Sequence, residues 1–144
     1  MIPELRGLTL WRPWDIAMCR LGKDIENRPK PPPKALVGAL IALYTGQHFD
    51  KAGSEKIQRL TGKPLTHWDS LPGYIVGVMR LTGFVTSSDS KWFTGPFGIT
   101  FTDLRSIEPV ACKPKIAMGW WRMPSADIDA LVRSRYTAAL AVRS

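Results

Sequence analysis

The sequence predicts an α+β domain, mainly β, in which a small barrel or curled mixed sheet of about five to seven strands carries two or three flanking helices. Short β-rich runs bounded by glycine recur along the chain. One long run, Tyr74–Thr86, contains Gly77 and Gly83, as a sharply curled strand would. No βαβ rhythm is present, and the 144 residues correspond to one domain, 1–144.

The N-terminal third is expected to hold a strand, a helix and an extended segment. Leu8–Leu10 is a short apolar run, and Pro13 suits the first turn of the helix that follows. Gly22 is expected to end that helix, after which Asp24–Arg28 is extended and the proline-rich run 29–33 forms a stiff exposed connection. The apolar residues of the helix recur at i, i+3, i+4 and i+7: Trp14, Ala17, Met18 and Leu21.

The middle of the chain is expected to alternate strand, helix and strand. Leu40–Thr45 is rich in bulky residues and is bounded by glycine, which is typical of a buried strand. Asp50–Thr61 is predicted to be a helix that Asp50 caps and Gly62 ends. The curled strand Tyr74–Thr86 follows it.

Three further strands and a last helix complete the predicted domain. The strands are expected at Gly98–Thr102, Val110–Cys112 and Met118–Met123, and Ser125 is the N-cap of the helix. The expected apolar side of this helix consists of Ile128, Leu131, Val132 and Tyr136.

The formal charge of +8 favours a polyanionic partner, with nucleic acid ahead of a membrane surface. Basic residues exceed acidic ones in each third of the chain, so folding must assemble any positive surface. No apolar run reaches the roughly 20 residues of a membrane helix. Cys19 and Cys112 form no metal-type cluster and suit a reducing compartment, so a cytoplasmic location is expected.

The sharpest local cluster is Lys-Asp-Ile-Glu-Asn-Arg at residues 23–28. In a strand Asp24, Glu26 and Arg28 share one face, and Lys23 follows a turn that bends it towards Glu26. A glutamate held beside two cations stays ionised and can orient a water or a base edge. The alternative is a solvated ladder of surface ion pairs.

A second cluster consists of aromatic residues next to cations. Such pairs suit single-stranded nucleic acid, because the rings stack on bases while the cations bind phosphates. Trp11-Arg12-Pro13-Trp14 places two indoles beside a guanidinium. Trp14 lies on the apolar side of its helix and is expected in the core. Trp92, in the polar loop 90–98, is the indole expected to stack on a base.

Motifs for metals, cofactors and common enzyme classes are absent from the sequence. His48 and His67 are far apart and fit no zinc spacing, and the sequence has no Walker loop, dinucleotide fingerprint or G-x-S-x-G. We therefore expect no metal and no cofactor.

Six stretches, in order along nearly the whole chain, resemble the ASCH domains, a family with a PUA-like barrel. In the signature Gly-x-Lys-x-x-Glu-x-Arg, Lys23, Glu26 and Arg28 stand in place, whereas the first glycine position holds Leu21. Tyr44 stands where similar relatives often carry histidine. The six stretches are Leu8–Trp14, Gly22–Arg28, Ile41–Gly46, Ile75–Leu81, Ser90–Gly98 and Gly119–Pro124.

The resemblance implies a PUA-like curled barrel and a cleft beside it, lined by Lys23, Glu26 and Arg28, that binds RNA or other nucleic acid. One branch of the family hydrolyses the acyl amide of a modified cytidine with a lysine and a threonine three residues later. Glu26 stands at that threonine position here, so the nucleophilic hydroxyl is absent. Nuclease activity has also been suggested within the family.

Three functions follow from these observations. In the first, the cleft binds RNA or another single strand: Arg12, Lys23 and Arg28 contact phosphate or base, Glu26 accepts from a base amino group, Trp92 stacks and Tyr44 adjoins the site. In the second, the chain hydrolyses a modified nucleoside or RNA, with Glu26 as general base and Lys23 stabilising negative charge. In the third it is a scaffold whose charge serves only solubility.

Overall fold

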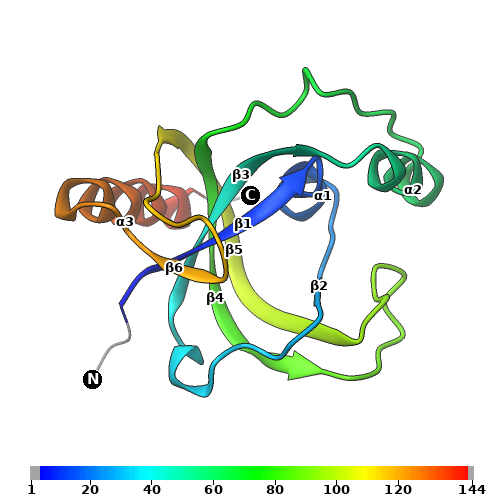
Figure 1. The fold of residues 1–144 in the computed structure, drawn as a ribbon, viewed down its shortest axis with the longest axis horizontal. Helices are drawn as coiled ribbons and strands as arrows, with labels where there is room; N and C mark the ends of the chain where they lie inside the picture. Colours follow the sequence, from blue (N-terminus) through cyan, green and yellow to red (C-terminus); the bar gives the residue numbers. More distant parts are fainter. Residues whose placement is uncertain (1–3, 143–144) are drawn as a thin grey trace.

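The computed structural model describes residues 4–142 and shows an α+β fold, mainly β, built on one six-stranded mixed sheet (Figure 1). The strand order is β2-β5-β4-β3-β1-β6. Residues 1–3 and 143–144 of the predicted domain lie outside the described part. The elements are β1 (Arg6–Arg12), α1 (Trp14–Arg20), β2 (Glu26–Arg28), a 3₁₀ turn (Lys34–Leu36), β3 (Leu40–Phe49), α2 (Lys51–Thr61), β4 (Tyr74–Val85), β5 (Phe97–Ala111), β6 (Trp120–Arg122) and α3 (Ala126–Ala141).

The sheet curls but does not close, so the expected small barrel is wrong and the curled mixed sheet is the observed form. β1 and β3 are parallel, and every other pair is antiparallel. Three register shifts between β4 and β5 bend this pair, as bulges do. The edge strands β2 and β6 have three residues each and pair with one neighbour each, so they cannot bridge the opening.

Most predicted elements are present, with two corrections. The predicted strand Gly98–Thr102 and the first two residues of the predicted strand Val110–Cys112 belong to one 15-residue strand, β5, which ends before Cys112. β5 continues through a polar run where Asp103 has a φ of 55°. In α3 Leu131 is 39% exposed, while Val132 and Tyr136 are buried. The predicted caps are confirmed, because Asp50 accepts from the Gly53 N–H and Ser125 from the Ile128 N–H.

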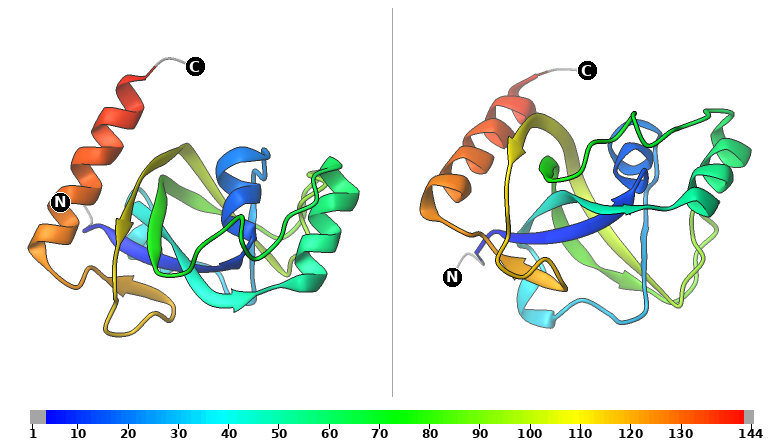
Figure 2. Two further views of the ribbon diagram at one scale, coloured as in Figure 1. Left: turned by 90° about the horizontal axis from the view of Figure 1, so that it is seen from above. Right: turned by 45° about the horizontal axis from the view of Figure 1, so that its top comes forward.

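The helices divide the molecule into two ends. α3 packs at one end, and α1, α2 and β2 lie towards the other (Figures 1 and 2). At that second end a small core of Ala17, Ile25, Ile57 and Trp92 joins α1, the segment before β2, α2 and the loop before β5. This core fixes the elements that carry the charged cluster. Within residues 4–142 no helix is both long enough and apolar enough to cross a membrane.

Candidate functional site

A cleft of about 500 Å³ opens between β1, α1, β2 and α2. Its size is within the range of small-molecule sites in proteins. Three basic side chains and one acidic side chain line it, together with two indoles. The lining residues are Thr9, Leu10, Trp11, Trp14, Lys23, Glu26, Asn27, Arg28, Pro29, Lys56 and Thr94.

The Lys23, Glu26 and Arg28 side chains meet in one wall of this cleft. Gly22 has a φ of 79°, which lets the chain turn after α1 and directs Lys23 back. The Lys23 Nζ donates to Glu26 Oε1 at 2.8 Å and to the Ile25 carbonyl at 2.6 Å. Arg28 Nε donates to Glu26 Oε2 at 3.0 Å, and its Nη2 donates to the Thr9 carbonyl at 3.0 Å. The carboxylate is therefore held at both oxygens.

Burial distinguishes this cluster from a ladder of surface ion pairs. Lys23 is 3% exposed and Glu26 is 8% exposed. Burial alone would raise the pKa of Glu26, but the positive charges and hydrogen bonds of Lys23 and Arg28 outweigh it and lower the pKa below its ordinary value. The carboxylate is thus ionised at neutral pH and carries a fixed negative charge between two cations.

Arg28 and Lys56 are the cations that remain open to a ligand. The Arg28 side chain is 27% exposed, and within residues 4–142 no acceptor bonds its Nη1. Lys56 is half-buried on α2 and its ammonium has no hydrogen-bond partner in the same part of the chain. Both groups are therefore free to donate to an anion in the cleft.

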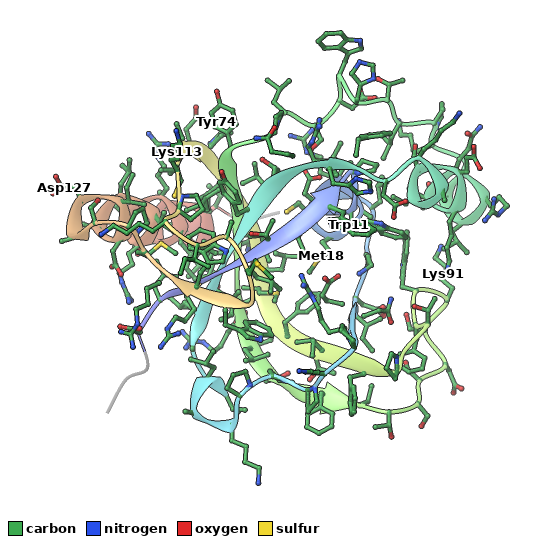
Figure 3. All side chains as sticks on the ribbon, viewed as in Figure 1. Trp11, Met18, Tyr74, Lys91, Lys113 and Asp127 are labelled. Carbon is green, nitrogen blue, oxygen red and sulfur yellow. The ribbon has the colours of Figure 1, made fainter. Side chains whose placement is uncertain are left out.

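Two indoles of the N-terminal motif form the aromatic part of the cleft. Trp14 packs against the small core, as predicted, but it is only half-buried and also forms part of the cleft wall, where its Nε1 donates to Asp50 at 2.9 Å. The Lys23 ammonium lies 5.4 Å from the centre of the Trp14 ring. Trp11 is 57% exposed near the α1 end of β1 (Figure 3) and is in edge contact with His48 at 4.3 Å.

Trp92 does not stack in the cleft, which corrects the sequence prediction. It is 3% exposed and packs in the small core behind β2. Asn27 folds the loop inward, because its side chain donates to the Trp92 carbonyl and accepts from the Thr94 and Gly95 N–H groups. The polar composition of the loop concealed this inward fold.

Arg12 and Tyr44 also lie outside the cleft lining. Arg12 is buried, and its guanidinium donates to four backbone carbonyls, those of Gly46, Gln47, His67 and Ser70. Tyr44 is buried on the α3 side of the sheet, where its hydroxyl donates to the Cys112 carbonyl at 3.0 Å and its ring contacts Trp121. Both side chains are therefore structural.

Asn27 and Lys56 line the cleft but were not among the site residues that the sequence predicts. Asn27 lies inside the charged motif, and the only signal for it was an amide side chain within a segment predicted to be extended. Lys56 comes from α2, 28 positions after Arg28, and no local pattern ties it to the cleft. Its place depends on the packing of α2 against α1.

No protein-family model matches this chain, and no curated protein matches it in sequence. The resemblance to ASCH domains therefore stays a prediction, and the function is argued from the chemistry of the cleft.

Proposed function

We propose that this chain is a nucleic-acid-binding domain of the ASCH type, with a PUA-like fold, that takes an unpaired nucleotide of RNA or another single strand into the cleft. The observation that carries the proposal is the combination of exposed indole surface with open cations around a buried, fixed carboxylate. Aromatic faces and cations in one groove are typical of single-strand binding.

Each group in the cleft has a role in this proposal. The base stacks on Trp11 or Trp14, and the phosphate binds Arg28 Nη1 and Lys56. Each oxygen of Glu26 holds one donor and retains a second lone pair, so the carboxylate accepts from a base amino group. Lys23 keeps Glu26 charged and in place.

The hydrolase alternative has less support. A general base must be free to take a proton, and its pKa should lie near the working pH. The pKa of Glu26 is lowered and both of its oxygens are bonded to cations. The Lys23 ammonium already holds two acceptors and faces the Trp14 ring. These features favour binding over catalysis.

Fluorescence anisotropy with a labelled nine-nucleotide single-stranded RNA tests the proposal. We expect binding that weakens steeply with salt, because each phosphate contact contributes about 0.7 to the logarithmic slope for a single strand. Arg28→Ala and Lys56→Ala should each weaken binding and reduce the slope. Lys34→Ala, which removes an exposed lysine from the 3₁₀ turn, is the matched control and should bind as the wild type does.

Two results would contradict the proposal. One is an affinity that does not change between low and moderate salt. The other is equal weakening by Lys34→Ala and Lys56→Ala, since that would mean that binding depends on net charge alone.

A further inference from the structure

We infer that the binding surface continues past the cleft along an exposed aromatic strip, made of Trp11, His48, His67 and Trp68, so that the ligand is a single strand several nucleotides long. This inference rests on the proposed function and adds the substrate class: an extended strand, as opposed to a free nucleotide or a duplex.

The strip consists of two sets of ring contacts, one at the cleft and one in the loop before β4, which meet through the backbone at the neighbouring β3 residues His48 and Phe49. Trp11 lines the cleft and contacts His48, with ring centres 4.3 Å apart. Phe49, the next residue of β3, contacts His67 at 6.2 Å, and His67 lies against Trp68 at 4.6 Å. Each of the two histidines of the chain belongs to one of these sets. Except for the half-buried Phe49, these side chains are exposed.

Trp68 is the end of the strip and the most exposed indole among the described residues, at 76%. An indole is a large apolar surface, and scaffolds that expose one at a fixed position commonly use it to bind. Its position on a loop between α2 and β4 separates it from the core clusters. No packing role within residues 4–142 accounts for it.

The loop that carries Trp68 is held firmly. Buried Arg12 donates to the carbonyls of His67 and Ser70, which precede and follow Trp68 in the sequence. Asp69 accepts from the backbone N–H and the hydroxyl of Thr66, which closes the turn around Trp68. Ser54 of α2 donates to the Leu65 carbonyl at 2.7 Å. A preformed platform binds without the entropic cost of ordering a loop.

The residues of α2 and the turn after it have an excess of positive charge, as expected for a surface that binds a polyanion. The segment Lys51–Lys63, which forms α2 and the turn after it, contains four basic residues and one acidic residue. One of the four, Lys56, already lines the cleft. Flat rings beside excess positive charge match a single strand, whose bases are free to stack while its phosphates face the cations. A duplex offers no free base faces to the strip.

The test compares a labelled trinucleotide with a labelled nonanucleotide of RNA, by anisotropy at one salt concentration. Wild type should bind the nonanucleotide more tightly, and Trp68→Ala should weaken nonanucleotide binding about 5- to 100-fold, the range of one lost base stack. Trinucleotide binding should stay within twofold of the wild type. Trp68→Phe, which keeps an aromatic face, should restore most of the loss.

Phe84→Ala is the matched control, because it removes an exposed aromatic ring from the opposite end of β4. Unchanged circular dichroism and melting temperature show that the Trp68 variants fold. The inference is overturned if Trp68→Ala binds the nonanucleotide as tightly as the wild type does. The tryptophan would then serve another partner, such as a protein, while the proposed function stands. If the wild type binds neither RNA, the proposed function fails and the inference with it.

Discussion

Arg12 and Arg28 show how differently two arginines near one cleft can be used. The Arg28 guanidinium donates through Nε to Glu26 and through Nη2 to the Thr9 carbonyl. Within residues 4–142 its Nη1 has no acceptor, so this group can donate to a ligand. Arg12 is buried and donates to four carbonyls, two near the end of β3 and two in the loop between α2 and β4. The planar guanidinium carries five N–H donors spread over a rigid fork, whereas an ammonium carries three on a single atom. Arg12 therefore shapes the surface that carries Trp68.

We predict that Arg12→Ala lowers the free energy of unfolding by about 2–4 kcal/mol, because it leaves buried carbonyls without donors. Arg12→Lys should recover less than half of the loss, since one ammonium cannot reach all four acceptors. Urea denaturation of both variants measures this. Arg105→Ala, an exposed arginine of β5, is the control. A loss below about 0.5 kcal/mol for Arg12→Ala would contradict the structural role.

Glu26 makes the stability of this cluster depend on pH. Its pKa in the folded chain lies below the ordinary value of 4.5, so its contribution is fully present above about pH 4.5 and is lost as the pH falls through the folded pKa. Glu26→Gln removes this contribution and leaves Lys23 buried without a counter-charge. We expect a loss of about 3 kcal/mol at pH 7, which shrinks below pH 4.5.

Unfolding free energies of wild type and Glu26→Gln, measured from pH 7 down to pH 3, check this prediction. Groups that titrate in both proteins cancel in the difference. A difference that stays constant over the whole range would mean that the carboxylate is not stabilised by its neighbours.

The positions of site residues could be predicted from the sequence where their partners are close along the chain. They could not be predicted where the partners are distant. Lys23, Glu26 and Arg28 lie within six positions, so strand alternation and one turn were enough to bring them together. Trp92, in the loop before β5, is buried in a core with Ala17 of α1 and Ile57 of α2. A polar loop sequence contains no sign of such contacts.

At the scale of elements, α2 is placed by the close approach of its first turn to α1. A Cβ atom on Gly53 would lie 2.6 Å from the Trp14 Nε1 and 2.5 Å from the Asp50 carboxylate. These two groups are hydrogen-bonded to each other, and Asp50 also caps the helix. The glycine therefore allows α2, and Lys56 with it, to approach the cleft wall.

We predict that Gly53→Ala lowers the melting temperature, although alanine is the better helix former by about 1 kcal/mol. The added methyl must separate Trp14 from Asp50 or remove the cap, and each change costs about 1 kcal/mol or more. Thermal unfolding followed by circular dichroism measures the shift. Gln58→Ala, at an exposed position of the same helix, should leave the melting temperature nearly unchanged. A higher melting temperature for Gly53→Ala would disprove the close approach.

The elements themselves were predictable because their caps and periodicity are local. The helix caps at Asp50 and Ser125 and the curled strand β4 follow from short patterns. The continuity of β5 and the open edge of the sheet do not follow from short sequence patterns. β5 bends through residues with low β-propensity, and whether a sheet closes depends on the pairing of edge strands that are far apart in the sequence.

At the scale of the whole molecule, α1, β2 and α2, which contribute to the cleft lining, lie away from α3 (Figures 1 and 2). The basic residues behind the net charge of +8 are spread along the chain. Folding brings three of them into the cleft that contains one buried carboxylate. Trp11 lines this cleft, and Trp68 lies on the loop between α2 and β4. The cleft therefore combines cations with indole surface, the groups that a single strand requires.

The indole N–H region of a ¹⁵N-labelled NMR spectrum tests the central claim most directly, because the six tryptophans are distributed over the cleft, the strip and the core. On titration with a nonanucleotide RNA, we predict that the Trp11 and Trp14 indole signals shift progressively and saturate. The signals of buried Trp92 and Trp121 should remain in place. Unmoved Trp11 and Trp14 signals at saturating RNA would contradict binding in the cleft.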